Sequence, residues 1–403
     1  MMNILIISKY FYPRNSIASF RINAFAKYIR NAGHSVTVIA EGDQDMDTEW
    51  NGCKVSYVKN KIMTVSYLRD KIKRRKRWTV RRITASLLNR IFLDYNLFWG
   101  FRVFKKANKL FKENRYDVVL SSYMPISPHL AALNLQLVGH KFFWIADMRD
   151  EMSKHPYFSK KYKSAYIAIY ERLFLKNADL VLSVSKPILD DFRKMHSSSN
   201  YLEVRNGYDY EEVYDVNFQS KFTMGYIGQF YDKIKPDNWF HAFSELISEG
   251  RIPKDSIIKI IGNNMKIKIP DNIINNVFEI ESVPHDEAIR ISTTEVDVLV
   301  MIHPLGRKGV YSGKIFDYLA TNKPILALYD PDDVVGDLLR ETRAGFTVKE
   351  SDIEGIKSMI LKCYSIWKNR EVLPRDWNKI KQCRRFNQTK ILLDYLSEHL
   401  PNQ

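Results

Sequence analysis

Short apolar runs alternate with helical patterns along this chain, and this alternation constrains its fold more than any other feature. The run Asn3–Ser8 is followed by a loop, by a helical pattern over Phe20–Asn31 and by a second apolar run at Ser35–Ala40. Such continuous apolar runs are typical of strands buried on both faces of a parallel sheet. Because parallel strands need helical crossovers, the pattern predicts the α/β class with doubly wound sheets.

The same alternation starts again in the second half of the chain. The apolar runs there are Phe222–Ile227, Ile257–Ile261, Val277–Ile280, Val296–Ile302, Ile325–Tyr329 and Phe346–Val348. At 403 residues the chain is also too long for one typical domain. We therefore expect two Rossmann-like domains, residues 1–210 and 211–385. The residue pattern changes at Glu211–Ser220, where we place the boundary.

The segment Tyr311–Leu326 is the strongest candidate for a ligand site. It reads as the loop, helix and strand that follow an apolar run, with Lys314 and Asp317 at the start of the helix. Ligands of open α/β sheets bind where strands end, and the first turn of a helix favours a phosphate. Lys314 adds a charge there, and Asp317 could accept hydrogen bonds from sugar hydroxyls. Alternatively, Ser312 caps an ordinary helix and Lys314 is solvated.

This segment also carries a resemblance to a known family. SGKIFDYLATNKPILAL, at Ser312–Leu328, resembles the donor-binding segment of family-4 glycosyltransferases. The resemblance implies the GT-B architecture, in which two Rossmann-like domains face an interdomain cleft. It also implies that Lys314, with the Ser312 and Gly313 amides, lies near the diphosphate of a nucleotide sugar and Asp317 near its ribose. The sequence departs from the family at Asp317, where Glu is usual, and at Gly309, where many members have a second Glu.

The resemblance extends to the start of the second domain. In the family, the loop after the first strand brings cations to the donor diphosphate. Here Gly228 ends the strand, and Lys233 and Lys235 are the matching cations, although Gln229 replaces the usual Arg. The implied reaction is transfer with retention, in which fixed cations take up the charge of the leaving nucleoside diphosphate. We therefore assign Lys233 a catalytic role and expect a UDP- or GDP-linked donor, no cofactor and no metal.

The first domain has its own candidate residues after the apolar run Lys141–Met148. This run ends in Asp147-Met148-Arg149-Asp150, which resembles the D-L-R-D segment of one branch of the family. Charged residues just past a central strand need partners or a cleft. Asp150 is therefore a candidate to orient or deprotonate an acceptor hydroxyl, with Arg149 beside it as a second catalytic candidate. The alternative is a structural Asp–Arg bridge.

The loop near residues 13–21 supplies further candidates. Arg14, Ser16 and Arg21, together with Asp147, are the expected acceptor-side residues. The glycine pair usual in the family is absent, and Asn15-Ser16 stand in its place. The arginines could equally be ordinary surface residues. The family further implies that residues 386–403 form a helix that crosses back onto the first domain.

A basic stretch at Arg69–Phe92, inside an expected helical insertion at about 61–110, suggests an anionic partner. It contains ten Lys or Arg residues and one acid, and Val80, Ile83, Leu87 and Ile91 share one helical face. Such a helix is typical of a membrane surface, and the formal charge of +16 agrees with this. A solvated surface and nucleic-acid binding are the alternatives, although no nucleic-acid module accompanies the stretch. We expect peripheral association with the inner face of the plasma membrane.

The remaining features narrow the function. Three scattered cysteines favour a reducing cytoplasm over a disulfide framework or structural metal site. We read no signal peptide and no membrane-spanning run. Asp45-Met46-Asp47 and Asp330-Pro331-Asp332 have the spacing of a metal-binding pair but read as turns. The expected acceptor is a saccharide or a polyprenyl-diphosphate-linked sugar in cell-surface polysaccharide synthesis, such as lipopolysaccharide or capsule. A sugar-nucleotide epimerase and a degenerate membrane scaffold remain alternatives.

Overall fold

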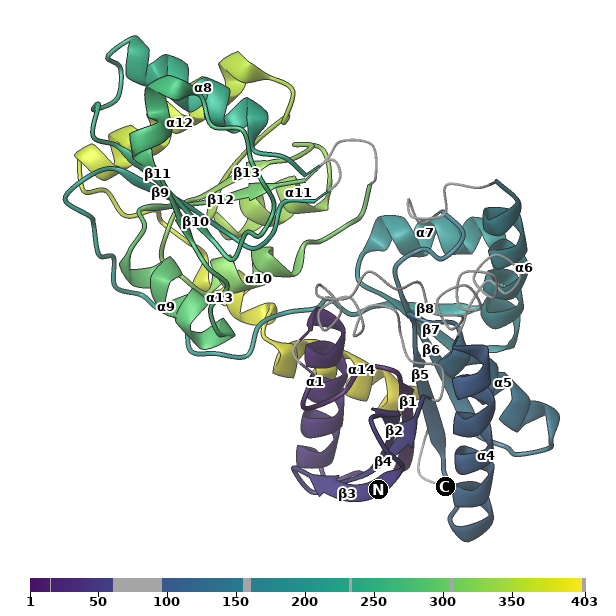
Figure 1. Ribbon diagram of the computed structural model, residues 1–403. Helices are drawn as coiled ribbons and strands as arrows, with labels where there is room; N and C mark the ends of the chain where they lie inside the picture. The colour runs from purple at the N-terminus through teal and green to yellow at the C-terminus, as the bar shows by residue number, and fades with distance from the viewer. Residues whose placement is uncertain (15, 61–95, 155–160, 232–233, 304–307, 401–403) are drawn as a thin grey trace, which may run out of the picture. The chain divides into compact units, whose positions relative to one another are not determined.

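The computed structural model describes residues 1–14, 16–60, 96–154, 161–231, 234–303 and 308–400 (Figure 1). The chain forms two compact units. The N-terminal unit comprises Met1–Arg205 together with Gln388–Gln403, and the C-terminal unit comprises Asn206–Asn387. The basic stretch Arg69–Phe92 and Lys233 lie outside the described residues. None of the described helices is long and apolar enough to cross a membrane.

The N-terminal unit is built on an eight-stranded sheet with the order β3-β4-β2-β1-β5-β6-β7-β8. Its strands are β1 (Asn3–Ser8), β2 (Ser35–Gly42), β3 (Met46–Trp50), β4 (Cys53–Lys59), β5 (Val118–Ser122), β6 (Phe143–Arg149), β7 (Leu180–Ser183) and β8 (Asn200–Glu203). All neighbours pair in parallel except β3, which is antiparallel to β4. The sequence did not indicate β3, because this exposed edge strand has no apolar run.

Helices cover both faces of this sheet (Figure 1). Helices α1 (Ile17–Asn31) and α14 (Arg385–His399) share a core with one face; α14 contributes Leu392 and Leu396. The other face is covered by α4 (Leu97–Glu113), α5 (Ser127–Leu137), α6 (Lys161–Asn177) and α7 (Lys186–Met195). Although α4 begins inside the range of the expected insertion, its Trp99, Val103 and Ala107 are part of this core.

The C-terminal unit has a wholly parallel, six-stranded sheet with the order β11-β10-β9-β12-β13-β14. The strands are β9 (Thr223–Ile227), β10 (Ile257–Ile261), β11 (Val277–Ile280), β12 (Val298–Ile302), β13 (Ile325–Leu328) and β14 (Gly345–Val348). One face packs against α8 (Asp237–Ser248), η1 (Asp271–Asn276) and α12 (Ile353–Lys368). The other packs against α10 (Gly313–Leu319), α11 (Val334–Thr342) and α13 (Trp377–Gln382), and α9 (His285–Thr294) follows β11.

Each sheet has a point at which the strand order reverses, which is where doubly wound sheets bind ligands. In the N-terminal unit it lies between β1 and β5, and in the C-terminal unit between β9 and β12. The predicted α/β class with two doubly wound, parallel-dominated sheets is therefore confirmed. The two reversal points place β1, β5, β9 and β12 at the centres of the sheets.

Candidate functional site

Lys314 is half-buried and lies at the reversal point of the C-terminal sheet. Its Nζ donates a hydrogen bond of 2.9 Å to the hydroxyl of Tyr226 and lies 4.2 Å from the centre of the Tyr226 ring. Burial lowers the pKa of Lys314 to about 8. Among the described residues, no carboxylate forms an ion pair with it. A buried cation that lacks a charged partner is costly, and such groups mark sites that bind a charged ligand.

Gly228, the first residue after β9, leaves room for the Lys314 side chain. Its φ of +116° belongs to the region that favours glycine. A Cβ added at this position would lie 2.6 Å from Cε of Lys314. Glycine is thus favoured here both for its backbone conformation and for its lack of a side chain. The sequence singles out Gly228 and Lys314 in two separate segments, and the structure brings them into contact.

Asp317 lies one turn after Lys314 on α10, and burial raises the pKa of its carboxyl to about 6. Nε2 of His285, on α9, is 4.0 Å from its carboxylate. The hydroxyl of Tyr210 donates to the backbone carbonyl of Asp317 rather than to its side chain. Among the residues that the structure describes, none donates a hydrogen bond to this carboxylate. Its oxygens therefore remain available as acceptors for a ligand hydroxyl.

The other donor-side candidates are less closely associated with Lys314. Ser312 occupies the N-cap position of α10 but its side chain makes no capping hydrogen bond, and Gly313 begins a helix of only seven residues. Lys235 is exposed just before α8. Lys233 cannot be placed, since it lies outside the described residues. The short helix makes Lys314, rather than the helix dipole, the main source of positive charge.

Gly309, which stands where the family often has an acid, is held by the backbone. Its φ is +80°, and its N–H donates a 2.8 Å hydrogen bond to the buried carboxylate of Asp333. A glutamate at this position would have a backbone conformation that side chains rarely adopt. The backbone conformation of the loop therefore favours glycine at position 309 over the glutamate found in many family members.

The end of the motif has a structural role that the sequence did not indicate. Nζ of Lys323 donates to the carbonyl of Asn217. The buried guanidinium of Arg375 donates to four carbonyls, those of Leu319, Thr321, Lys323 and Ala344. These bonds fasten the end of α10, the start of β13 and the segment before β9 to one another. They hold the segment that carries Lys314 and Asp317 in place.

In the N-terminal unit, Arg21 and Asp147 bind each other. Arg21 is 2% exposed and Asp147 is 0% exposed. Nε and Nη2 of Arg21 donate to the carboxylate at 2.8–3.2 Å, and the Ser122 hydroxyl donates to it at 2.8 Å. Nη1 of Arg21 donates to the carbonyls of Val204 and Arg205. The two residues expected on the acceptor side are thus buried and bonded to each other, and their acceptor-side role stays a prediction.

Arg149 and Asp150 follow this pair at the end of β6. Arg149 has a φ of +59° at a register shift between β6 and β7, and its Nη1 donates to the carbonyl of Tyr123 at 3.0 Å. It forms no ion pair with a carboxylate among the described residues. Asp150 is partly exposed, and its N–H donates to the carbonyl of Met148. The structural Asp–Arg bridge considered for this segment therefore exists, but it joins Asp147 to Arg21.

Glu171 holds the loop that contains Asp150, and the sequence did not single it out. Its buried carboxylate accepts hydrogen bonds from the N–H groups of Met152 and Ser153, at 2.7 and 3.3 Å, and from the Ser153 hydroxyl. Burial raises the pKa of Glu171. One sequence signal could have identified Glu171. It is an acid at a helix position where the surrounding pattern predicts an apolar residue.

The remaining acceptor-side candidates have local partners. Nη2 of Arg14 lies 2.6 Å from the buried carboxylate of Glu41, at the end of β2. Nζ of Lys9, just after β1, donates to Oδ1 of Asn96 at 2.9 Å. Ser16 is the N-cap of α1 and forms a capping box with Ser19. Arg14 and Ser16 therefore stabilise the loop and helix that surround the reversal point of this sheet.

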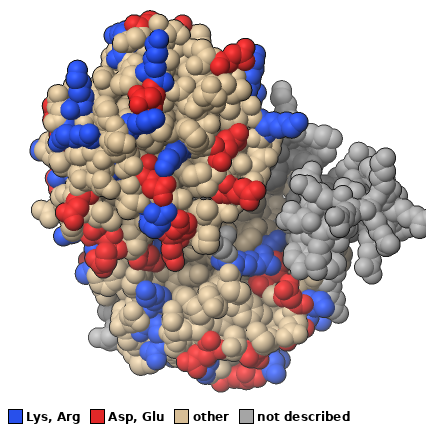
Figure 2. Space-filling model, turned by 60° about the vertical axis from the view of Figure 1, so that its left-hand side comes forward, with Lys and Arg blue, Asp and Glu red and all other residues tan. Residues whose placement is uncertain are grey.

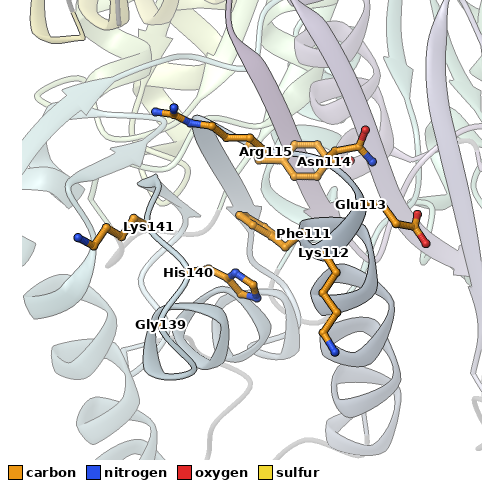
Figure 3. A pocket seen from close by; sticks show the side chains of 9 residues that line it. Phe111, Lys112, Glu113, Asn114, Arg115, Gly139, His140 and Lys141 are labelled. Carbon is orange, nitrogen blue, oxygen red and sulfur yellow. The ribbon is translucent and has the colours of Figure 1, made fainter.

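The structure also describes polar surface features away from these residues. Asp45 and Asp47 pair with Arg102 and Lys106 on α4. Within the described ranges, no group of three His, Cys, Asp or Glu residues could hold a metal ion. A pocket of about 430 Å³ lies between the end of α4 and the segment before β6, with Phe111 and His140 facing each other, ring centres 4.6 Å apart (Figure 3). It opens at the amino ends of β5 and β6, opposite the edge that carries the candidate residues.

Comparison with known proteins finds a family profile that matches part of the chain and solved structures that share its fold. The profile of Glycosyltransferase Family 4 matches residues 19–212. No curated protein matches the sequence closely enough to serve as a relative. Among solved structures, the chain is similar to a sucrose-phosphate synthase from Thermosynechococcus elongatus, with 13% identity, a TM-score of 0.68 and 99% coverage of both chains.

Two further structures show the same likeness. The lipopolysaccharide outer core galactosyltransferase WaaB has 11% identity and a TM-score of 0.60, covering 99% of this chain and 100% of that one. An E. coli structure titled trehalose-6-phosphate, bound with UDP-2-fluoro glucose, has 9% identity and a TM-score of 0.64, covering 98% and 99%. At these identities the likeness is one of fold.

Proposed function

Since this chain is a family-4-like glycosyltransferase with the GT-B fold, we propose that it moves a sugar from a nucleotide-diphosphate sugar to a saccharide or lipid-linked acceptor, with retention at the anomeric carbon. The C-terminal unit binds the donor, and the N-terminal unit carries the acceptor-side residues. The reaction belongs to cell-surface polysaccharide synthesis, and the enzyme works at the inner face of the plasma membrane. The likeness to a lipopolysaccharide galactosyltransferase supports this setting.

The desolvated, half-buried amine of Lys314 is the observation that carries the proposal. Its pKa is lowered to about 8 because it is desolvated without an ion-pair partner among the described residues. A diphosphate placed next to Nζ supplies the missing negative charge and restores the pKa. Each pKa unit recovered corresponds to about 1.4 kcal/mol by which the diphosphate favours the protonated amine over the neutral one. Neither a solvated surface lysine nor a lysine in a structural ion pair would gain in this way.

The same lysine then serves the chemical step. As the bond between the sugar and the diphosphate breaks, negative charge grows on the departing phosphate. Fixed donors aimed at that charge typically lower the barrier by about 3–4 kcal/mol each. Lys314 and the backbone amides at Ser312 and Gly313 supply these donors in the proposal, and Lys233 and Lys235 add charge from the loop after Gly228. Asp317 holds the ribose through hydroxyl hydrogen bonds.

On the acceptor side, Asp150 is the group that we propose to orient the attacking hydroxyl. It is partly exposed, unlike the buried Asp147, and the loop behind it is fixed by Glu171. Arg149, with no carboxylate partner among the described residues, stands next to it as a fixed positive charge. No metal is assigned to the reaction, since the charge of the leaving group is met by lysines.

A thermal-shift panel of UDP, GDP and their sugars tests the proposal. The wild type is compared with Lys314→Met, which removes the charge but keeps most of the side-chain volume. Lys362→Met is the matched control, because Nζ of Lys362 also lies 4.2 Å from an aromatic ring centre, that of Phe346, but on exposed α12. We expect a nucleotide-specific rise in melting temperature that persists in Lys362→Met and is lost in Lys314→Met. A panel without any shift would reject a donor site.

A degenerate, non-enzymatic scaffold is the second candidate, because Gly309 and Gln229 replace charged residues typical of the family. The two candidates differ in turnover. A transferase slowly hydrolyses its donor even without acceptor, whereas a scaffold binds the nucleotide and leaves it intact. Release of free UDP or GDP from the nucleotide sugar identified by the panel would indicate a transferase, and its absence would indicate a scaffold.

A further inference from the structure

The outward face of α6 combines apolar and basic side chains. Tyr166, Ile169 and Leu173 are exposed there at helical spacing, and Ile169 is 64% exposed. Arg172 and Lys176 are exposed on the same face. The acid of this stretch, Glu171, points the other way and is buried in the unit. The exposed face from Tyr166 to Lys176 is therefore apolar and positive.

Helix α4 shows the same combination. Phe101 is 57% exposed, and Lys105, Lys109 and Lys112 follow it along the same exposed face. Nζ of Lys105 lies 4.6 Å from the centre of the Phe101 ring. The helix carries five basic residues and one acid, Glu113. Aromatic rings next to flexible lysines are typical of surfaces that meet a lipid headgroup layer.

Both helices belong to one layer of the N-terminal unit. Helix α5 packs against α4 on one side and α6 on the other, and all three contribute to the core on the same face of the sheet (Figure 1). The outward faces of α4 and α6 therefore lie on the same side of that sheet. We call them together the α4/α6 surface.

Four α-helices of the C-terminal unit do not share this property. Among their described residues, α8, α9, α11 and α12 expose no large hydrophobic side chain. Basic and acidic side chains are also interspersed over the face of the molecule in Figure 2. Exposed apolar side chains that gather at helical spacing in one layer indicate an interaction surface, whereas isolated ones do not.

We propose that the α4/α6 surface docks on an anionic lipid bilayer. It is formed by described residues and is separate in the sequence from Arg69–Phe92. Its lysines and arginines match lipid phosphates, and Phe101, Tyr166, Ile169 and Leu173 enter the headgroup layer. A nucleic acid would not use the aliphatic pair Ile169 and Leu173, and a second copy of the chain would have to bury like charges against each other. This inference deepens the proposed lipid-linked reaction and in that respect rests on it.

Sedimentation of the full-length protein with vesicles tests the inference. The vesicles contain phosphatidylglycerol in phosphatidylcholine, with pure phosphatidylcholine as the neutral comparison. One variant, Phe101→Ser/Ile169→Ser/Leu173→Ser, removes apolar side chains; another, Lys105→Glu/Lys109→Glu, reverses charge. The matched controls in the C-terminal unit are Ile274→Ser/Phe278→Ser, at positions 55% and 50% exposed, and Lys254→Glu/Lys266→Glu. Melting temperatures verify that every variant is folded.

We expect binding to anionic vesicles that falls roughly fivefold or more for each lysine removed and by a similar factor in the apolar variant. The controls should bind as the wild type does. Equal binding by all variants would overturn the inference. So would a wild-type dimer in sedimentation velocity that the apolar variant converts to a monomer without any change in vesicle binding. Binding to duplex nucleic acid lost in the lysine variant, with no vesicle binding by the wild type, would also overturn it.

The nucleotide panel separates this inference from the proposed function. The variants of the α4/α6 surface should keep the wild-type thermal shift with nucleotide, since none of them touches Lys314 or Asp317. A chain that binds vesicles but no nucleotide would reject the donor site and leave the lipid surface standing. A chain that binds nucleotide but no vesicles would overturn the lipid-docking inference and leave the proposed donor site standing.

Discussion

The two units treat buried charge at their sheet reversal points in opposite ways. In the N-terminal unit, Arg21 and Asp147 are bonded to each other in a closed pair. In the C-terminal unit, Lys314 and Asp317 are half-buried, Lys314 has no ion-pair partner among the described residues, and Asp317 has only His285 at 4.0 Å. Their pKa values shift toward the neutral forms, to about 8 and about 6. A paired buried charge specifies structure, whereas an unpaired one stores a binding free energy that a ligand can release. We therefore expect the closed pair to stabilise the fold, and we propose that Lys314 and Asp317 bind a ligand.

The largest expected effect is a difference in the free energy of unfolding between a variant of the closed pair and a variant of Lys314. Arg21→Met leaves Asp147 buried without its cation, and removing one partner of a buried pair costs about 3–5 kcal/mol. Lys314→Met removes a desolvated charge that has no ion-pair partner among the described residues, so the free energy of unfolding should not fall. Urea denaturation followed by circular dichroism measures both. Equal losses in the two variants would mean that Lys314 is also a framework residue.

The next effect sharpens the assignment of Gly228. An alanine Cβ there would lie 2.6 Å from Cε of Lys314 and displace the amine, so Gly228→Ala should weaken nucleotide binding more than about tenfold. Gly262→Ala is the matched control: Gly262 also follows a strand with positive φ, +81°, but its added Cβ would come no closer than 3.8 Å to its neighbours. Isothermal titration calorimetry compares the two. Similar losses in both variants would attribute the effect to backbone strain.

The pH dependence of donor binding is expected to have two limbs. The pKa of Lys314 is about 8, and the anionic diphosphate binds the protonated amine, so affinity should fall about tenfold per pH unit above 8. The pKa of Asp317 is about 6, and hydroxyl hydrogen bonds need the carboxylate, so affinity should also fall below 6. Titrations with the nucleotide sugar between pH 5 and 9.5 record both limbs.

Two variants assign these limbs. Lys314→Met should abolish the alkaline limb and Asp317→Asn the acid limb, each leaving the other in place. A profile that is flat from pH 5 to 9.5 in the wild type would show that neither residue titrates in the donor site.

The smallest expected effect concerns Tyr226. Tyr226→Phe keeps the ring beside Lys314 but removes the hydroxyl that accepts the 2.9 Å hydrogen bond from Nζ. A hydrogen bond to a charged group contributes about 1.5–3 kcal/mol, so the free-enzyme pKa of Lys314 should fall further. The alkaline limb should therefore move to lower pH, by up to about two units. An unmoved limb would mean that the hydroxyl does not stabilise the ammonium.

Much of the fold was predictable because buried parallel strands leave a simple signal. The apolar runs at Ile257–Ile261 and Val277–Ile280 coincide with β10 and β11. The exposed edge strand β3 was missed because Met46–Trp50 contains two acids and no apolar run. Helix α5 was missed because most of its residues are buried, so it has no polar face and no helical period.

The candidate site was predictable in part, because its motif is local. The spacing of Lys314 and Asp317 could be read from one segment, but the environment that lowers the pKa of Lys314 comes from Tyr226 and Gly228, some 90 residues earlier. The pairing of Arg21 with Asp147 joins residues 126 positions apart, so the sequence showed two charged candidates where the structure has one closed pair. Burial and long-range pairing decide whether a charge is free, and neither can be read from one stretch of sequence.

The most direct test of the account is the affinity of UDP and GDP for the wild type, Lys314→Met and Lys362→Met, measured by calorimetry at pH 7. The account predicts that one nucleotide binds the wild type and Lys362→Met equally and binds Lys314→Met at least about tenfold more weakly. Equal affinity in all three proteins would contradict the claim that the half-buried Lys314 is the donor diphosphate site.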